Sequence, residues 1–114
     1  MHNQLSVVII SKNEEKFIAD AVKSALFADE VLVLDSGSTD GTCTVAQQLG
    51  AKVLHQDWLG FGAQKNKAVE LAKNDWVFVL DSDERITPEL QSEILNTLQE
   101  PTADGYHTAR LNNF

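Results

Sequence analysis

The sequence predicts an α/β domain with a mostly parallel sheet and helices on both faces, and two observations support this. Four short apolar runs rich in β-branched residues alternate with amphipathic stretches, in the order β-α-β-α-β-α-β-α. The apolar runs are nearly continuous, as expected of strands covered on both faces. The chain of 114 residues has room for one domain, residues 1–114.

The predicted strands are the four apolar runs, namely Leu5–Ser11, Glu30–Asp35, Ala51–Gln56 and Trp76–Asp81. A further strand is expected to begin within Gly105–Phe114 and has no helix after it to cover it. We therefore expect a truncated domain, although a disordered tail, or a terminal strand that pairs with a second copy of the chain, is an alternative.

The predicted helices lie between these strands. The first is indicated by an apolar stripe with i, i+4 spacing, formed by Phe17, Ile18, Ala21, Val22, Ala25 and Leu26. The second covers about Thr39–Leu49, with Ser38 or Thr39 as its cap and Gly50 as its stop, and the third covers about Gly62–Lys73. The fourth begins at Thr87 as N-cap with Pro88 at the first helical position, and Pro101 ends it.

Composition excludes several classes of protein. A net charge of −8 disfavours a nucleic-acid-binding protein, which needs clustered basic residues. No apolar run approaches the roughly 20 residues of a membrane span. The one cysteine, Cys43, fits a reducing cytoplasm.

Acidic and small polar residues follow the first, second and fourth predicted strands. Ligands of open parallel sheets bind at the carboxyl ends of the strands, so this asymmetry places the site. Asp81 and Asp83 are the sharpest feature, because residues i and i+2 at a strand end point to the same side. Two unpaired carboxylates would repel each other, and a divalent cation that also holds substrate phosphates would relieve this. The alternative is a solvated acidic turn.

Two other positions are candidates. Asp35 at the end of the second strand could accept hydrogen bonds from a ribose or a base, or could only form a turn. Lys65 follows two glycines near the start of a helix and could face a diphosphate, or could be an exposed lysine on an amphipathic helix.

Four motifs together resemble the family 2 inverting glycosyltransferases, which have the Rossmann-like GT-A nucleotide-sugar-binding fold. They are SVVIISKNE at 6–14, VLDSGSTDGT at 33–42, Lys65-Asn66, and VLDSDE at 79–84. The residues of these motifs, together with GFGAQKN at 60–66, are similar to those of the bacterial branch that builds the lipopolysaccharide core.

The resemblance implies roles for individual positions. Ser11, Asn13 and Glu14 match the strand end and loop that border the nucleotide, and Asp35 matches the nucleoside contact. Lys65 stands where many members have Arg. Asp81 is expected near the ribose and as a metal ligand, and Asp83 as the direct ligand of Mg²⁺ or Mn²⁺. Many members have two successive acids where this chain has Asp35-Ser36.

The resemblance also implies a reaction. A sugar would pass with inversion from a nucleotide-diphospho-sugar, a UDP-sugar by analogy, to a saccharide or lipid-linked acceptor in lipopolysaccharide or other cell-envelope glycan synthesis. The general base is expected from chain beyond Phe114. The expected location is the cytoplasm, at the inner face of the membrane if the acceptor is lipid-linked.

Three rival functions stay open at this point. A phosphotransferase of the haloacid-dehalogenase type also uses Asp-x-Asp after a strand, although usually on the first strand. An NAD-binding module could use Asp35, although no G-x-G-x-x-G follows the first strand. The third rival is a nucleotide-binding fragment without catalytic turnover.

Overall fold

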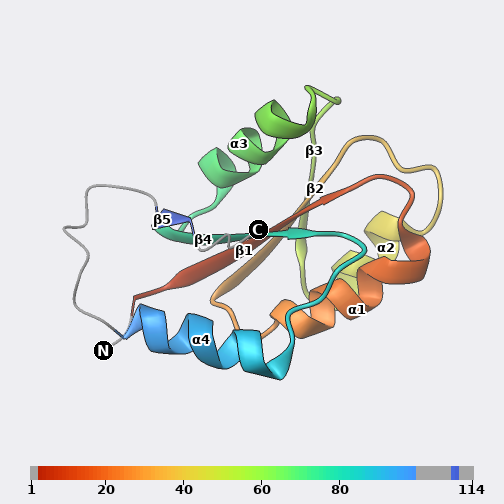
Figure 1. Cartoon of the computed structure of the whole chain (residues 1–114). Coiled ribbons are helices and arrows are strands. Elements are labelled where there is room, and N and C mark those ends of the chain that lie inside the picture. The colour runs from red at the N-terminus through yellow and green to blue at the C-terminus, as the bar shows by residue number, and fades with distance from the viewer. Residues whose placement is uncertain (1–2, 100–108, 111–114) are drawn as a thin grey trace.

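The computed structural model describes residues 3–99 and 109–110 (Figure 1). The strands are β1 (Leu5–Ser11), β2 (Glu30–Asp35), β3 (Lys52–His55), β4 (Trp76–Asp81) and β5 (Ala109–Arg110), and the helices are α1 (Glu15–Ala25), α2 (Thr42–Gln48), α3 (Phe61–Leu71) and α4 (Pro88–Leu98). The predicted α/β alternation is confirmed. β1, β2 and β4 have the bounds expected from the sequence, and β3 is one residue shorter at each end.

All strand pairs of the described sheet are parallel, in the order β3-β2-β1-β4-β5. Strand order therefore reverses at β1, which pairs with β2 on one side and β4 on the other. The pairing aligns Ser11 with Asp35 and Ile10 with Asp81, so the polar ends of these strands share one edge. This is the switch point at which open α/β sheets bind ligands.

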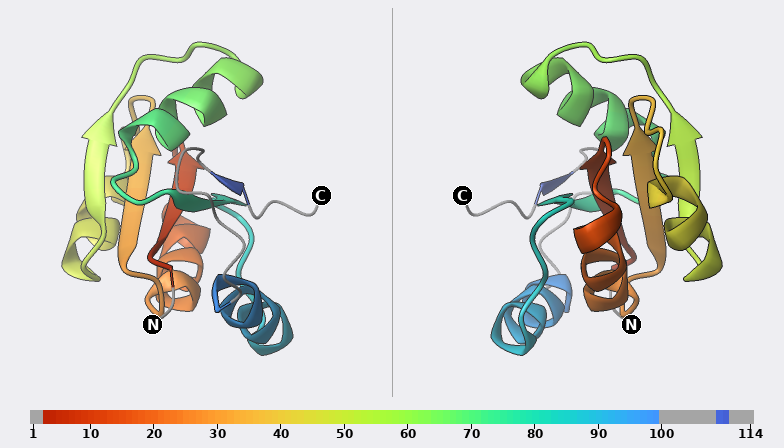
Figure 2. Two further views of the ribbon diagram at one scale, coloured as in Figure 1. Left: turned by 90° about the vertical axis from the view of Figure 1, so that its left-hand side faces the viewer. Right: turned by 90° about the vertical axis from the view of Figure 1, so that its right-hand side faces the viewer.

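Helices cover both faces of the sheet (Figure 2). One apolar cluster joins alternate strand residues, such as Ile9 and Leu80, to α1, α2 and α4. The residues between them, such as Val8 and Val79, form a smaller cluster with α3. Successive side chains of each strand thus point to opposite faces, which we call the α1 face and the α3 face.

Two details of the helices differ from the prediction. Phe17 and Leu26 lie outside the buried stripe of α1 and are half-exposed, at 50% and 49%. α2 begins at Thr42 rather than near Thr39, with Gly41 as N-cap and no cap bond from Ser38 or Thr39. The cause is competition, because Thr39 N donates to Asn13 Oδ1 at 2.8 Å and Gly41 N donates to Glu15 Oε1 at 3.1 Å.

The other predicted helix ends are confirmed within a residue or two. Gly50 follows α2 with a φ of +102°, and Gly50 N and Ala51 N donate to Gln47 O and Ala46 O, which is a Schellman ending. Thr87 caps α4 through a 3.1 Å bond that its hydroxyl accepts from Leu90 N.

The last predicted strand falls mostly outside the described residues. Ala109 and Arg110 pair with Trp76 and Val77 of β4, whereas Pro101 and the rest of 105–114 are not among the described residues. No helix in the described part of the chain has both the length and the apolar character needed to cross a bilayer.

Candidate functional site

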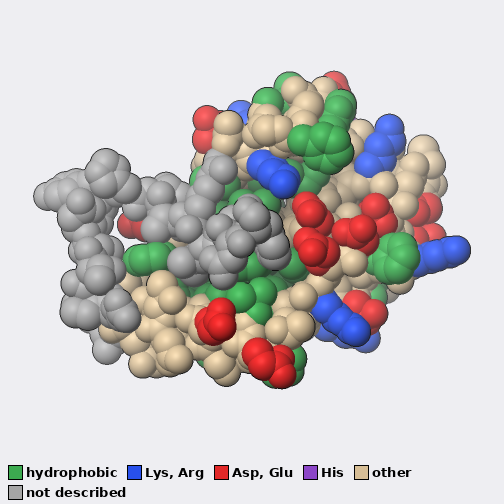
Figure 3. All heavy atoms as spheres, in the orientation of Figure 1, with side chains coloured by type: hydrophobic (Ala, Val, Ile, Leu, Met, Phe, Trp, Pro, Cys, Tyr) green, Lys and Arg blue, Asp and Glu red, His purple; other side chains and the backbone are tan. Residues whose placement is uncertain are grey.

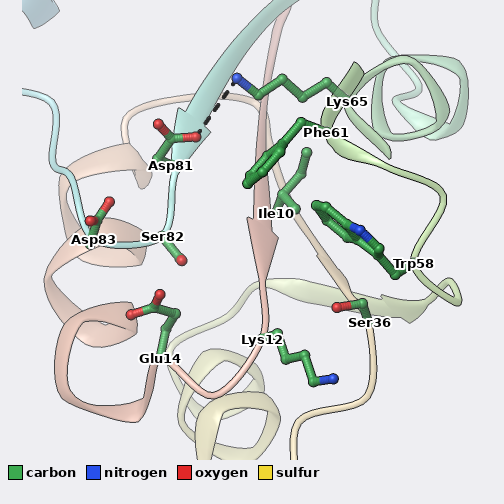
Figure 4. A pocket seen from close by; sticks show the side chains of 10 residues that line it. All are labelled: Ile10, Lys12, Glu14, Ser36, Trp58, Phe61, Lys65, Asp81, Ser82 and Asp83. Carbon is green, nitrogen blue, oxygen red and sulfur yellow. Dashed lines mark ion pairs between the residues drawn. The ribbon is translucent and has the colours of Figure 1, made fainter. Parts of the chain in front are cut away.

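A pocket of about 590 Å³ opens at the carboxyl ends of β1 and β4 (Figure 4). Its ten lining residues are Ile10, Lys12, Glu14, Ser36, Trp58, Phe61, Lys65, Asp81, Ser82 and Asp83. Four of the predicted site residues are among them, namely Glu14, Lys65, Asp81 and Asp83. The other three, Ser11, Asn13 and Asp35, do not line it.

Strand alternation explains this division. Ser11 and Asp35 continue the α1-face series of β1 and β2, so both side chains turn away from α3 and are buried, at 2% and 3% exposure. Ile10, Ser36 and Asp81 continue the α3-face series, and they meet residues from the β3–α3 segment in the pocket. The sequence contained this signal, since odd and even positions of a strand face opposite ways.

Asp35 joins the strand end to the following loop through its carboxylate. Oδ1 accepts from Ser11 Oγ at 2.7 Å and from Ser38 Oγ, and Oδ2 accepts from Gly37 N at 3.0 Å and Ser38 N at 2.7 Å. Burial alone would raise the pKa of Asp35, but the hydrogen bonds from Ser38, Ser11 and Gly37 outweigh it and lower the pKa. A carboxylate has about four acceptor sites, so the described bonds use its capacity.

Asn13 joins the loop after β1 to the loop after β2. It has a left-handed φ of +53°, which Asn tolerates better than most residues. Asn13 N donates to Ser38 Oγ at 2.8 Å, and Asn13 Oδ1 accepts from Thr39 N. Next to it, Glu14 N donates to Thr42 Oγ1 at 2.9 Å. Asn13 thus positions the two loops, and direct contact of Ser11, Asn13 or Asp35 with a nucleotide stays a prediction.

Both predicted metal ligands line the pocket, but only Asp81 lies in the strand whose alternation was expected to direct the two side chains to one side. Asp81 ends β4, whereas Asp83 lies in a turn closed by a 3.0 Å bond from Glu84 N to Asp81 O. Strand alternation therefore accounts for the direction of Asp81 alone. Lys65 Nζ reaches across from α3 to within 4.0 Å of Asp81 Oδ1, as the dashed line in Figure 4 marks.

Acidic side chains gather on the face shown in Figure 3, with basic side chains at the edges of the group. Burial, and then the charges of Asp81 and Asp83, raise the pKa of Glu84. The corner thus holds more negative charge than Lys65 balances. A cation would be electrostatically favoured there.

The donor set at this corner fits a hard cation that completes its coordination elsewhere. Asp81 and Asp83 offer exposed carboxylate oxygens, the ligand type that Mg²⁺ and Mn²⁺ take. No group of three or more His, Cys, Asp or Glu side chains in the described residues could hold a metal ion by itself. Phosphate oxygens and water would therefore have to supply the remaining ligands.

The opposite wall of the pocket is aromatic, and neither of its rings was among the predicted site residues. Trp58 and Phe61 form this wall, as Figure 4 shows. Lys12 and Ser36 also line the pocket and were not among the predicted site residues. The alternation that sorts Ser36 from Asp35 could have identified Ser36.

Comparison with known proteins identifies the family to which the chain is similar. The model of glycosyl transferase family 2 matches residues 6–114. An uncharacterized glycosyltransferase of Rickettsia felis is 49% identical over 92 residues, which are 80% of this chain and 32% of that protein. The lipopolysaccharide core biosynthesis glycosyltransferase LpsC of Rhizobium meliloti is 34% identical over 92 residues, 76% of this chain and 34% of that protein. The chain thus spans about a third of the length of these relatives.

Solved structures show the same fold. Glucosyl-3-phosphoglycerate synthase of Mycobacterium tuberculosis, in complex with Mn²⁺, UDP and glucosyl-3-phosphoglycerate, matches with a TM-score of 0.68 and 29% identity, covering 82% of this chain and 40% of that one. The same enzyme has also been crystallised with Mg²⁺ and UDP. Because the family model covers nearly the whole sequence, the chain belongs to the family 2 glycosyltransferases.

Proposed function

We propose that this chain binds the nucleotide-sugar donor of an inverting glycosyltransferase, with UDP as the nucleotide. The observation that carries the proposal is the pocket at the switch point, in which Asp81 and Asp83 face an aromatic wall across β1. The family and the UDP bound by a structural relative support it. Transfer to a saccharide or lipid-linked acceptor, in the synthesis of lipopolysaccharide or another cell-envelope glycan, is the reaction we propose for the whole protein, and the name of LpsC supports this.

In this proposal Asp81 and Asp83 hold a Mg²⁺ or Mn²⁺ ion together with the diphosphate of the donor. The bound ion supplies Lewis-acid chemistry, because it neutralises negative charge on the leaving diphosphate. Mn²⁺ and Mg²⁺ in the related synthase complexes support this choice of cofactor.

The protein side chains bind and orient the donor. Lys65 Nζ, which lies within 4.0 Å of Asp81 Oδ1, would be available to the phosphates of the donor when Asp81 holds a cation. Lys12 lies at the other end of the pocket beside Ser36, as Figure 4 shows. Glu14 borders the site from the start of α1, and its carboxylate adds to the charge that favours a cation.

The proposal is tested by titrating the protein with UDP in a calorimeter, with Mn²⁺ and with EDTA. We expect binding that depends on Mn²⁺. Asp83→Ala should weaken binding in Mn²⁺ by about tenfold or more, because loss even of a residue that only supports a metal ligand typically costs 10- to 100-fold in metal affinity. Asp75→Ala is the matched control, since Asp75 is exposed and does not line the pocket.

Two results would contradict the proposal. One is UDP binding of equal strength with Mn²⁺ and with EDTA, which would remove the metal from the site. The other is an unchanged Mn²⁺ response in Asp83→Ala, which would place the cation elsewhere.

A further inference from the structure

The aromatic wall of the pocket consists of Trp58 and Phe61, which flank the start of α3. We propose that these two rings stack against the planar base of the donor nucleotide, and so set the affinity for its nucleoside part. The inference rests on the proposed function, because it needs a nucleotide in this pocket. It adds a contact that none of the predicted site residues provides.

Both rings are exposed to an unusual degree for aromatic side chains. Trp58 is 49% exposed and Phe61 is 75% exposed, although each could bury a large apolar area. Their ring centroids lie 5.0 Å apart with an interplanar angle of 90°, an edge-to-face pair. The pair forms a corner in which a flat ligand can lie on one ring and contact the edge of the other. Aromatic surfaces of this kind bind bases because every base has a π face.

The loop that carries Trp58 is held in place by a buried amide. Gln64 in α3 is completely buried, and its Oε1 accepts from Leu59 N at 3.1 Å while its Nε2 donates to Gln56 O at 3.1 Å. Gly60 permits the sharp entry into the helix with a φ of +100°. The exposure of Trp58 therefore belongs to a positioned surface rather than to a loosely held loop.

The wall lies at the end of the pocket away from the carboxylates. Asp81 ends β4 and Asp83 follows it, and from there the pocket extends across Ile10 of β1 to Ser36 after β2. Trp58 lies at that second end, close to Ser36 in Figure 4. A donor whose diphosphate lies at the carboxylates would thus place either its nucleoside or its sugar beside Trp58. The hydroxyl of Ser36 and the ammonium group of Lys12 can donate hydrogen bonds to base carbonyl oxygens.

Tryptophan fluorescence provides a direct test, because the chain has two tryptophans. Trp76 begins β4 at the opposite end of the strand from the pocket, so Trp76→Phe leaves Trp58 as the reporter. We expect UDP with Mn²⁺, and uridine or UMP at higher concentration, to quench this signal. Glucose alone should leave it unchanged, and quenching by glucose but not by uridine would overturn the assignment to the base.

Affinity measurements on variants test the energetic role. Base–aromatic stacking is worth roughly 1–3 kcal/mol, so Trp58→Leu should weaken UDP binding about 5- to 150-fold. Trp58→Phe keeps a ring and should retain most of the affinity. Leu59→Ala is the matched control, because Leu59 is 50% exposed in the same loop but does not line the pocket.

The outcomes separate this inference from the proposed function. UDP binding that depends on Mn²⁺ and on Asp83, but is unchanged in Trp58→Leu, would overturn the stacking role and leave the proposed function intact. Absence of any UDP binding by the unmodified protein would overturn both.

Discussion

Asp35 and Asp81 each end a strand of the same sheet, yet their carboxylates have opposite surroundings. Asp35 is 3% exposed and accepts hydrogen bonds within the protein, whereas the Asp81 side chain is 54% exposed in the pocket. The sequence indicated both residues as site candidates because each follows an apolar strand. Asp35 belongs to the alternating strand residues that face α1, and Asp81 to those that face α3. This difference separates a residue that shapes a loop from one that lines the pocket.

Asp35→Asn is expected to destabilise the fold at neutral pH by about 1–3 kcal/mol. Asparagine can keep one oxygen for the two backbone N–H donors, but it loses the negative charge and the second acceptor oxygen that two serine hydroxyls now use. Hydrogen bonds to a charged group contribute about this much. Urea denaturation at pH 7 measures the loss, with Asp75→Asn as the exposed control.

The same substitution changes the pH dependence of stability. The pKa of Asp35 is lower in the folded chain, so the unfolded state takes up the proton first as the pH falls. Its stabilising contribution is complete above the unfolded pKa of about 3.9 and is lost as the pH drops through the folded pKa. Unfolding of Asp35→Asn should therefore depend less on pH in the acid range. An unchanged acid profile would show that Asp35 does not contribute in this way.

At the scale of elements, the strands and most helix ends could be predicted because their signals are local. β-branched runs, Gly50 after α2 and the Thr87-Pro88 pair each act within a few residues. The start of α2 could not be predicted, because Thr39 and Gly41 bond to Asn13 and Glu15, about 26 positions earlier. Long-range partners of this kind override helix signals and leave no periodic trace in the sequence.

Two glycines should respond to alanine with opposite signs. Gly50 has a φ of +102°, so Gly50→Ala should cost about 1–2 kcal/mol. Gly62 lies within α3, has no atom within 4 Å of the site of a new Cβ, and should gain up to about 1 kcal/mol from alanine. Guanidinium denaturation of both variants measures the difference. A stabilising Gly50→Ala would contradict the assigned ending of α2.

On the scale of the whole molecule, the two faces of the sheet are unequally covered. Residues from α1, α2 and α4 contribute to the larger apolar cluster, whereas α3 covers the other face in the described part of the chain (Figure 2). α3 buries only Gln64 and Ala68 completely, and it also carries the Lys65 and Phe61 of the pocket. The sequence predicted helices on both faces, but the unequal cover depends on how strand order reverses.

This inequality predicts a local difference in stability. Backbone amides of α3 should exchange with solvent through a lower-energy opening than those of α1, which buries Ile18, Ala21, Val22 and Ala25. Native-state hydrogen exchange followed by NMR measures both helices in one sample. Equal protection of α1 and α3 would contradict the expected order.

The alternating directions of β4 restrict which changes of length the chain can accept. If one residue were added within β4, Asp81 would turn toward the apolar cluster beneath α1 and α4, and Leu80 would take its place beside Lys65. Such an insertion would keep every residue of the motif in the sequence but would remove the Asp81 carboxylate from the pocket. In this strand the count of residues before Asp81 matters as much as the identity of Asp81 itself.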